Sequence, residues 1–371
     1  MKNEKLKFYS LKNILSKNAQ YNIIFGERSN GKTYSVLEYG IKRYVEENEQ
    51  FALIRRWKED FRGKRGQSLF DGIVANGLIE KITLGKWQQV YYYGGKWYLA
   101  KNDDKLKRII HDDTPFAYGF ALSDMEHDKS TSYPKITTIL FDEFLSRQAY
   151  FPDEFVIFMN VLSTIIRHRN NVKIFMLGNT VNKFCPYFAE MGLSHILEMK
   201  KGNIDVYTYG NSKLKVAVEY ADSIAKSKPS DIYFAFDNPK LNMITTGEWE
   251  LAIYPHLPYK YTPNQILFTF FIEFAENIIQ CEIVQNDIDL FIFCHRKTTP
   301  IKDREKDLIF SLIPSPSPNI QRRIFQPTKN KLLRNIISLF ASNRIFYQSN
   351  DIGEIVRNYI LTSEKSNIVI D

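Results

Sequence analysis

The sequence predicts an α/β fold that begins with a mainly parallel sheet, and two observations support that prediction. Through the first 200 residues, short apolar runs alternate with polar stretches of helical spacing, which is typical of buried parallel strands joined by helices. After Pro263 the pattern changes to three β-rich runs joined by short turns. Such turns favour an antiparallel meander, and hence a second, smaller α+β part.

The first part is expected to contain four strands and two long helices. Most of the strands are short runs of β-branched or aromatic residues, followed at once by polar or glycine residues. In the helices, apolar residues recur with the helical period. A small hairpin is also expected at 87–98, with its turn at Gly94-Gly95. The expected strands are 21–25, 50–55, 137–141 and 172–177, and the expected helices are 32–48 and 154–167.

The remainder of the chain is expected to form a connector and a C-terminal domain. Residues 201–255 combine a helical piece near 216–227 with turn-rich residues, so they are predicted to be a linker or small subdomain. The predicted domains are therefore 1–200, 201–255 and 256–371. In the last of these, the expected strands are 265–274, 277–284 and 288–294, and helices are expected near 328–342 and 351–361.

Composition and charge narrow the class of protein. The 371 residues exceed what one core usually holds, and 44% hydrophobic content excludes wholesale disorder. The longest apolar runs are too short for a membrane helix, and residues 1–6 lack a secretory signal, so we expect a cytoplasmic protein without a membrane partner. The three cysteines form no CxxC pair, which fits a reducing compartment. The net charge of +8 leans toward nucleic acid as a partner, although many soluble proteins are slightly basic.

Residues 26–33 match the phosphate-loop pattern G-x-x-x-x-G-K-[ST] at every defined position. The segment follows a predicted strand and opens a predicted helix, so its backbone N–H groups can receive phosphate oxygens. Lys32 supplies a charge to the β- and γ-phosphates, and the Thr33 hydroxyl is placed to ligate Mg²⁺. The alternative is a plain glycine turn before a helix. We expect ATP and Mg²⁺ to bind through Gly26, Glu27, Arg28, Ser29, Asn30, Gly31, Lys32 and Thr33.

A second motif ends the predicted strand 137–141. Asp142 follows that strand and would hold Mg²⁺, because open α/β sheets bind ligands outside the carboxyl ends of their strands. Glu143 is the expected base for the attacking water, which favours hydrolysis over transfer to a second substrate. Asp-Glu pairs are common on surfaces, so this pair is informative only together with the phosphate loop.

Two further positions have both a functional and a structural interpretation. Asn179, after the strand 172–177, is a candidate γ-phosphate sensor or part of a turn that ends the strand. Arg167 is a candidate arginine finger for a neighbouring subunit, or a cation favourably placed at a helix C-terminus. Arg28 is a candidate for the same part within its own chain.

These motifs resemble those of the DNA-packaging ATPases of φ29-type tailed phages, a branch of the terminase-like, ring-forming P-loop translocases. The resemblance covers roughly residues 15–200 well, whereas beyond residue 260 only the three-strand meander matches. Its most specific part is Phe141-Asp142-Glu143-Phe144, preceded by Lys129-Ser130 and Tyr133-Pro134. The other matching motifs are Phe25-Gly26, Gly31-Lys32-Thr33, Arg55-Arg56-Trp57-Lys58, Arg167-His168-Arg169, Gly178-Asn179 and Pro186-Tyr187-Phe188.

The resemblance implies an ASCE-type P-loop ATPase in a homomeric, typically pentameric ring. Such a ring docks on the procapsid portal in the host cytoplasm and drives double-stranded DNA into the shell. By matching position, Arg167 would be the trans-acting finger, and Lys129 a second basic residue that reaches the neighbour's nucleotide. Lys58 and Arg56 would face the pore, where contacts with DNA phosphates are independent of sequence. The alternative for residues 55–58 is a charged strand end whose Trp57 covers the sheet.

The resemblance also implies an RNase H-like C-terminal domain that has lost its cutting activity. Working nucleases of this kind hold two metals with clustered carboxylates, but Glu273, Glu282, Asp287 and Asp289 form no convincing triad. Seven basic residues would suit a packaging RNA or DNA, and a solvated helix face explains them equally well. They are Arg296, Lys297, Arg322, Arg323, Lys329, Lys331 and Arg334.

Two other functions remain open from the sequence. A conventional large terminase would both pump DNA and cut it with an active C-terminal nuclease. A non-motor protein would use ATP only to gate DNA binding or assembly.

Overall fold

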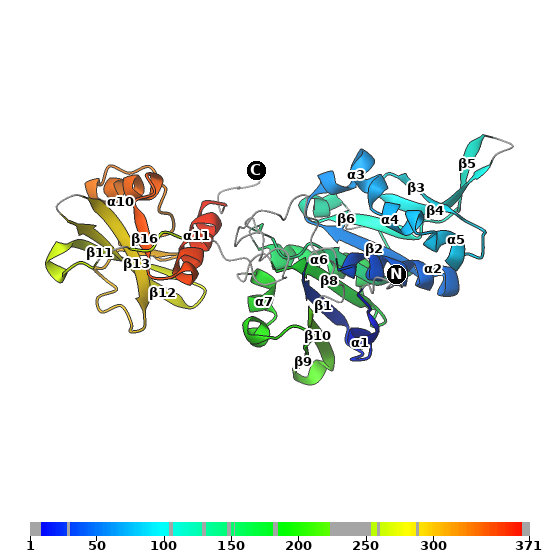
Figure 1. The fold of residues 1–371 in the computed structure, drawn as a ribbon, viewed down its shortest axis with the longest axis horizontal. Helices are drawn as coiled ribbons and strands as arrows, with labels where there is room; N and C mark the ends of the chain where they lie inside the picture. The colour runs from blue at the N-terminus through cyan, green and yellow to red at the C-terminus, as the bar shows by residue number, and fades with distance from the viewer. Residues whose placement is uncertain are drawn as a thin grey trace, which may run out of the picture. The chain divides into compact units, whose positions relative to one another are not determined.

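The computed structural model describes residues 9–27, 30–103, 107–127, 131–146, 150–151, 153–180, 185–222, 254–257, 260–286 and 289–365. The chain divides into two compact units, residues 1–147 with 153–249 and residues 148–152 with 250–371 (Figure 1). Within the described ranges, no helix is both long and apolar enough to cross a membrane.

A ten-stranded sheet organises the first unit, in the order β3-β4-β6-β2-β7-β8-β1-β10-β9 with β5 paired to β4. The strands from β6 to β10 in this order are mutually parallel, which confirms the predicted mainly parallel sheet. They are β6 (Ala117–Ala121), β2 (Gln50–Arg55), β7 (Ile136–Asp142), β8 (Lys173–Asn179), β1 (Tyr21–Gly26) and β10 (Leu214–Ala221). The antiparallel strands at the two sides are β3 (Gln89–Tyr93), β4 (Lys96–Asp103), β5 (Arg108–His111) and β9 (Ile204–Tyr209).

Helices cover both faces of this sheet, because its central strands are apolar on both sides. All seven residues of β7 are buried. Leu140 packs in the core beneath α2, α4 and α5, whereas the Phe141 ring lies against Phe158 of α6 and Tyr187 of α7 on the other face. The helices of this unit are α1 (Lys12–Leu15), α2 (Lys32–Glu47), α3 (Gly63–Ser68), α4 (Asp71–Ala75), α5 (Leu78–Ile82), α6 (Glu154–Ile166) and α7 (Pro186–Glu190), with 3₁₀ turns η1 (Lys58–Phe61), η2 (Leu122–His127), η3 (Ser194–Glu198) and η4 (Gly210–Ser212).

The predicted helical piece near 216–227 is wrong over 216–221, which belong to strand β10. This strand pairs parallel with β1 and antiparallel with β9, and its last six residues are buried. Burial on both faces and the β-branched Val216 and Val218 favour a strand, whereas short apolar runs are ambiguous in sequence. Residues 204–221 therefore belong to the first sheet and not to a linker. Residues 223–253, the rest of that predicted segment, lie outside the described part of the chain.

The second unit is built on a six-stranded sheet in the order β15-β14-β11-β12-β13-β16. Strands β11, β12 and β13 form the predicted antiparallel meander, and β14 and β16 extend it as parallel neighbours of β11 and β13. Buried Cys281 and Cys294 face each other across β12 and β13 as free thiols, with their sulfurs 3.4 Å apart. The elements are η5 (Pro263–Gln265), β11 (Ile266–Phe274), β12 (Asn277–Gln285), β13 (Leu290–Lys297), β14 (Ile309–Ser311), β15 (Ile320–Gln321), α10 (Lys331–Ala341), β16 (Ile345–Tyr347) and α11 (Asn350–Lys365).

The strand register of the first sheet brings several polar side chains to one edge. Gly26 of β1 lies beside Asn179 of β8, and Asp142 of β7 lies beside Leu177 of β8. Arg55 is the last residue of β2, which pairs with β7. Because parallel strands all end at the same edge, the phosphate-loop glycine and these side chains share it.

Candidate nucleotide-binding and catalytic site

The phosphate loop joins β1 to α2, as its sequence predicts. Steric constraints explain why both of its glycines are glycine. Gly26 has φ of 148°, and a Cβ there would lie 2.7 Å from the carbonyl oxygen of Ala221. Gly31 has φ of 90° and caps the N-terminus of α2. Residues that carry a Cβ rarely adopt such backbone conformations. The Asn30 side-chain oxygen accepts from the Lys32 backbone N–H at 3.2 Å, which orients the start of the helix.

Lys32 is buried inside this loop, with only 6% of its surface exposed. Its ammonium group donates to the carbonyl oxygens of Gly26, at 3.4 Å, and Glu27, at 2.5 Å. Burial lowers the pKa of Lys32 to about 8, and the carboxylates of Asp142 and Glu27 oppose that shift. A negatively charged group bound beside this buried lysine would therefore strongly stabilise its charged form.

The second predicted motif meets the loop. The Thr33 hydroxyl donates to Asp142 Oδ1 at 3.2 Å, which joins the start of α2 to the end of β7. Asp142 is 6% exposed, and this burial raises its pKa, while Arg55 and the Thr33 hydroxyl act in the opposite direction. A hydroxyl and a carboxylate are hard oxygen donors of the kind that Mg²⁺ prefers.

Arg55 belongs to this site, although the sequence did not single it out. Its Nη2 lies 2.6 Å from Asp142 Oδ2, and its Nη1 lies 3.5 Å from Glu143 Oε2. The single guanidinium thus forms ion pairs with both carboxylates. The signal that identifies it is the pairing of β2 with β7, which places the last residues of the two strands side by side.

Glu143 follows β7 in an unusual backbone conformation, with φ of 59°. Its side chain is 64% exposed, so the carboxylate is open to solvent water. The backbone of this turn is held from both sides: the Glu143 carbonyl accepts from Arg56 Nη1 at 3.3 Å, and the Phe144 N–H donates to the Leu177 carbonyl at 3.1 Å. Such support is what a left-handed non-glycine residue requires.

Arg56 was predicted to face DNA, but the structure buries it, with 8% of its surface exposed. Its Nε and Nη2 donate to the two carboxylate oxygens of the buried Glu154, at 2.9 and 2.8 Å. Nη2 also donates to the Phe144 carbonyl at 2.9 Å, and the Tyr187 hydroxyl donates to Glu154 at 2.9 Å. A bidentate, buried pair of this kind is structural, so the expected contact between Arg56 and DNA phosphates is not supported.

Tyr9 is a further residue that sequence reasoning missed. Its backbone N–H donates to the Asn30 carbonyl at 2.9 Å, and its carbonyl accepts from the Ser35 hydroxyl at 2.5 Å. Its own hydroxyl donates to the buried Glu219 of β10 at 2.6 Å. The segment before α1 therefore fastens the phosphate loop to the sheet, although no local motif marks it.

The other predicted residues are more dispersed. Asn179 ends β8, where it pairs with Gly26 of β1. Arg167 is exposed at the end of α6, before β8 begins, so it lies at the edge opposite the phosphate loop; its Nη2 donates to the Thr131 carbonyl at 3.1 Å. Lys58 is exposed and pairs with Asp124. Arg28, Ser29 and Lys129 lie outside the described residues.

Among the residues that the structure describes, several buried polar atoms in this site have no hydrogen-bond partner. They include Asn30 Nδ2 and Arg55 Nε, both donors, and Glu27 Oε2. Buried donors of this kind are costly unless a ligand satisfies them. Together with Lys32, Thr33 and Asp142, they fit a bound nucleotide with Mg²⁺.

The described carboxylates that were considered for a nuclease metal site in the second unit contact other side chains instead. Glu273 is bidentate with Arg304. Burial would raise the pKa of Glu282, but hydrogen bonds from His295, Tyr261 and Gln280 lower it to about 2. Asp289 Oδ1 lies 4.0 Å from Arg344 Nη1, and Asp287 is outside the described residues. Among the residues that the structure describes, no three His, Cys, Asp or Glu side chains are grouped for a metal ion.

Comparison with known proteins places these motifs in one family. The family model described as Podovirus DNA encapsidation protein (Gp16) matches residues 3–76 and 83–229. The DNA packaging protein of Bacillus phage B103 is 28% identical over 183 residues, which are 48% of this chain and 50% of that protein. The DNA packaging protein of Bacillus phage phi29 is 28% identical over 193 residues, 51% of this chain and 52% of that protein. The chain thus spans about half the length of the curated relatives that it matches.

Solved structures agree on the fold. A chain of the bacteriophage Phi-29 viral genome packaging motor assembly superposes with a TM-score of 0.59 at 19% identity, over 96% of this chain and 99% of the other. The Phi-28 gp11 DNA packaging motor gives a TM-score of 0.51 at 18% identity, over 96% and 98% of the two chains. Because the family model matches more than half of the residues, the chain belongs to the Podovirus DNA encapsidation protein (Gp16) family.

Proposed function

We propose that this chain is an ATP-hydrolysing motor that moves double-stranded DNA into a preformed procapsid. The observation that carries the proposal is the meeting of the phosphate loop with Asp142, through the 3.2 Å contact from the Thr33 hydroxyl. Membership of the DNA encapsidation family supports packaging as the work that hydrolysis drives.

Each residue of the site has a separate task. When bound, ATP with Mg²⁺ supplies the γ-phosphoryl group and the cation that neutralises it. Lys32 binds the phosphates, and Thr33 and Asp142 hold the metal. The Glu143 carboxylate orients the attacking water and accepts its proton, and Asn179 senses the γ-phosphate beside the loop.

The assembly is proposed from family membership and the position of the remaining residues. Arg167 lies at the edge opposite its own phosphate loop, which suits a finger that completes a neighbour's site in a ring, typically a pentamer. The ring would dock on the portal of the procapsid in the host cytoplasm, with Lys58 and Lys129 as contacts to DNA and to the neighbour's nucleotide. The C-terminal unit is proposed to be RNase H-like and nuclease-inactive, with a packaging RNA as the partner of its basic residues.

The test is ATP hydrolysis measured with DNA of increasing length. A motor is expected to hydrolyse ATP faster on longer duplexes, whereas a protein that only gates assembly would respond to DNA ends or to total DNA mass. Nicking of plasmid DNA with a divalent metal would favour the conventional terminase. Electron microscopy of procapsids with the protein, ATP and DNA would show whether a ring docks at the portal.

Nucleotide affinity is expected to fall as the pH rises above about 8. Lys32 is charged below its pKa of about 8, and bound phosphates raise that pKa, so binding above it requires uptake of a proton. Affinity should fall about tenfold per pH unit there, because the terminal phosphate is already ionised above about pH 6. Titration of a fluorescent ATP analogue from neutral to alkaline pH measures the slope. Lys32→Gln should bind weakly and without this slope; an equal slope in that variant would contradict the assignment.

Two inactive variants are expected to restore activity when mixed, if Arg167 acts on a neighbour. In a ring of Arg167→Ala and Glu143→Gln subunits at equal amounts, about a quarter of the interfaces combine an intact Glu143 with an intact Arg167. ATPase activity should recover toward that fraction. His168→Ala, a change at the exposed neighbouring position, should be active alone. No recovery on mixing would place Arg167 in its own chain's site or outside catalysis.

A further inference from the structure

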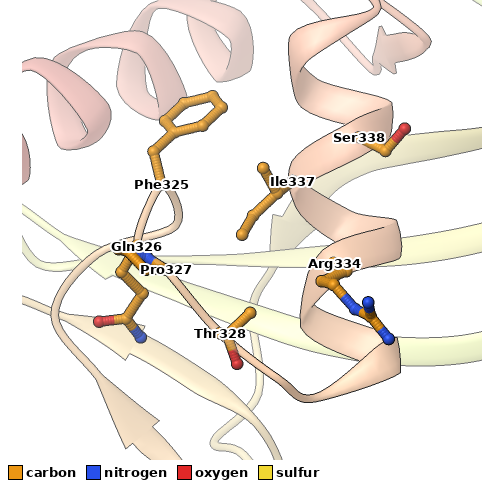
Figure 2. A pocket seen from close by; sticks show the side chains of 7 residues that line it. All are labelled: Phe325, Gln326, Pro327, Thr328, Arg334, Ile337 and Ser338. Carbon is orange, nitrogen blue, oxygen red and sulfur yellow. The ribbon is translucent and has the colours of Figure 1, made fainter.

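The second unit contains a pocket that the proposed hydrolysis mechanism does not use. It lies between residues 325–328 and one side of α10 and has a volume of about 430 Å³ (Figure 2). Ligand pockets usually measure about 300 to 1,000 Å³, so this one has room for a nucleotide-sized group.

The pocket combines an aromatic ring and an aliphatic side chain with a cation. Figure 2 shows Phe325 and Ile337 on opposite sides of it, one from the loop and one from the helix. Arg334 and Ser338 share the helical stripe of Ile337, because positions three and four apart lie on one face. The Arg334 guanidinium is exposed and makes no hydrogen bond or ion pair with the described residues.

The sequence segment that forms the pocket carries charge of one sign. Residues 321–344 contain six Lys or Arg and no Asp or Glu, in a chain whose net charge is +8. Such segregation attracts a polyanion and repels other basic surfaces. The six cations are Arg322, Arg323, Lys329, Lys331, Arg334 and Arg344.

We propose that this pocket binds an unpaired nucleotide of a single-stranded nucleic acid. The base lies between Phe325 and Ile337, and its phosphate pairs with Arg334. An aromatic face beside a cation is how proteins hold splayed bases, whereas a base that is stacked and paired in a duplex does not enter such a cleft. The proposal rests on the proposed function only in taking nucleic acid as the partner.

The test is fluorescence anisotropy of the full chain with short labelled oligouridine, oligothymidine of equal length and a DNA duplex. Phe325→Ala should weaken binding of the single strands about tenfold or more, and Phe325→Tyr should preserve it. Arg334→Gln should weaken it by a similar factor and reduce the logarithmic salt slope by about 0.7. Tighter binding of oligouridine than of oligothymidine would assign the site to RNA, and equal binding to single strands in general.

The controls separate the pocket from diffuse charge and from misfolding. Arg344→Gln removes one cation from the same basic segment outside the pocket and should change affinity less than about twofold. Ser338→Trp fills the pocket from an exposed helix position without altering the core, and it should weaken single-strand binding as Phe325→Ala does. Equal losses in Arg334→Gln and Arg344→Gln would overturn the proposal, and so would unchanged binding in Ser338→Trp. Binding of poly-glutamate as tight as that of oligouridine would assign the pocket to an acidic protein segment instead.

Duplex-stimulated ATPase activity, measured on the same preparations, separates the two proposals. The pocket variants should leave it unchanged. A wild-type chain without such activity, but with the single-strand pattern described above, would refute the motor and leave the nucleotide pocket standing.

Discussion

Glu143→Gln is expected to bind ATP with nearly unchanged affinity and to lower kcat about 10² to 10⁴-fold. Glutamine has the same shape but cannot accept a proton from water. The side chain is 64% exposed, and it forms an ion pair with Arg55, which lies outside the phosphate loop, so nucleotide binding should survive. Equilibrium binding of a fluorescent ATP analogue and steady-state release of phosphate measure the two quantities separately.

The matched control is Glu190→Gln, which makes the same chemical change at an exposed position on α7. It should leave both nucleotide binding and kcat unchanged. Turnover of Glu143→Gln at the wild-type rate would remove Glu143 from catalysis. Loss of binding together with turnover would instead make it part of the nucleotide pocket.

Arg56→Ala is expected to destabilise the first unit by about 3 to 5 kcal/mol. The change leaves the carboxylate of Glu154, which is 1% exposed, without its bidentate partner. It also removes the donors to the Glu143 and Phe144 carbonyls, so residual folded protein should hydrolyse ATP slowly. Denaturant unfolding of the full chain measures the stability, and kcat on the folded fraction measures the effect on Glu143.

Two further variants separate these effects. Replacing the pair together, as Arg56→Met with Glu154→Leu, should recover part of the stability because no buried charge is left alone, yet kcat should stay low. Lys58→Ala, an exposed change two residues away, should alter stability by less than about 0.5 kcal/mol. If Arg56→Ala weakened DNA binding with stability intact, Arg56 would be a surface contact after all.

Much of the nucleotide site could be predicted because its signal is local. Residues 26–33 contain the whole phosphate loop in one continuous stretch, and Asp142 with Glu143 follows a run of apolar residues that predicts a buried strand. Loop geometry and strand ends depend on residues that are neighbours in sequence, so a motif of a few positions is enough to predict them. The strands 21–25, 50–55, 137–141 and 172–177 and the meander were predicted for the same reason and are confirmed.

The residues that were missed or misassigned depend on which strands are neighbours. Arg55 and Arg56 are adjacent in sequence, yet one reaches Asp142 and the other is buried against Glu154. Consecutive side chains along an extended chain point in opposite directions. Which residues each of them contacts depends on the strand order β2-β7-β8. Arg56 was predicted to face DNA together with Lys58 because the sequence does not show that strand order.

What the sequence by itself determined is the class of the fold, the phosphate loop and the acidic pair that accompanies it. The tertiary structure alone decided that β10 pairs with β1, that Tyr9 fastens the loop to Glu219, and that Arg55 forms an ion pair with Asp142. The tertiary structure also buries Arg56, which was expected to lie at the surface. The physical reason is that periodicity and turn chemistry act between residues a few positions apart, whereas pairing and burial join residues up to 210 positions apart in the chain.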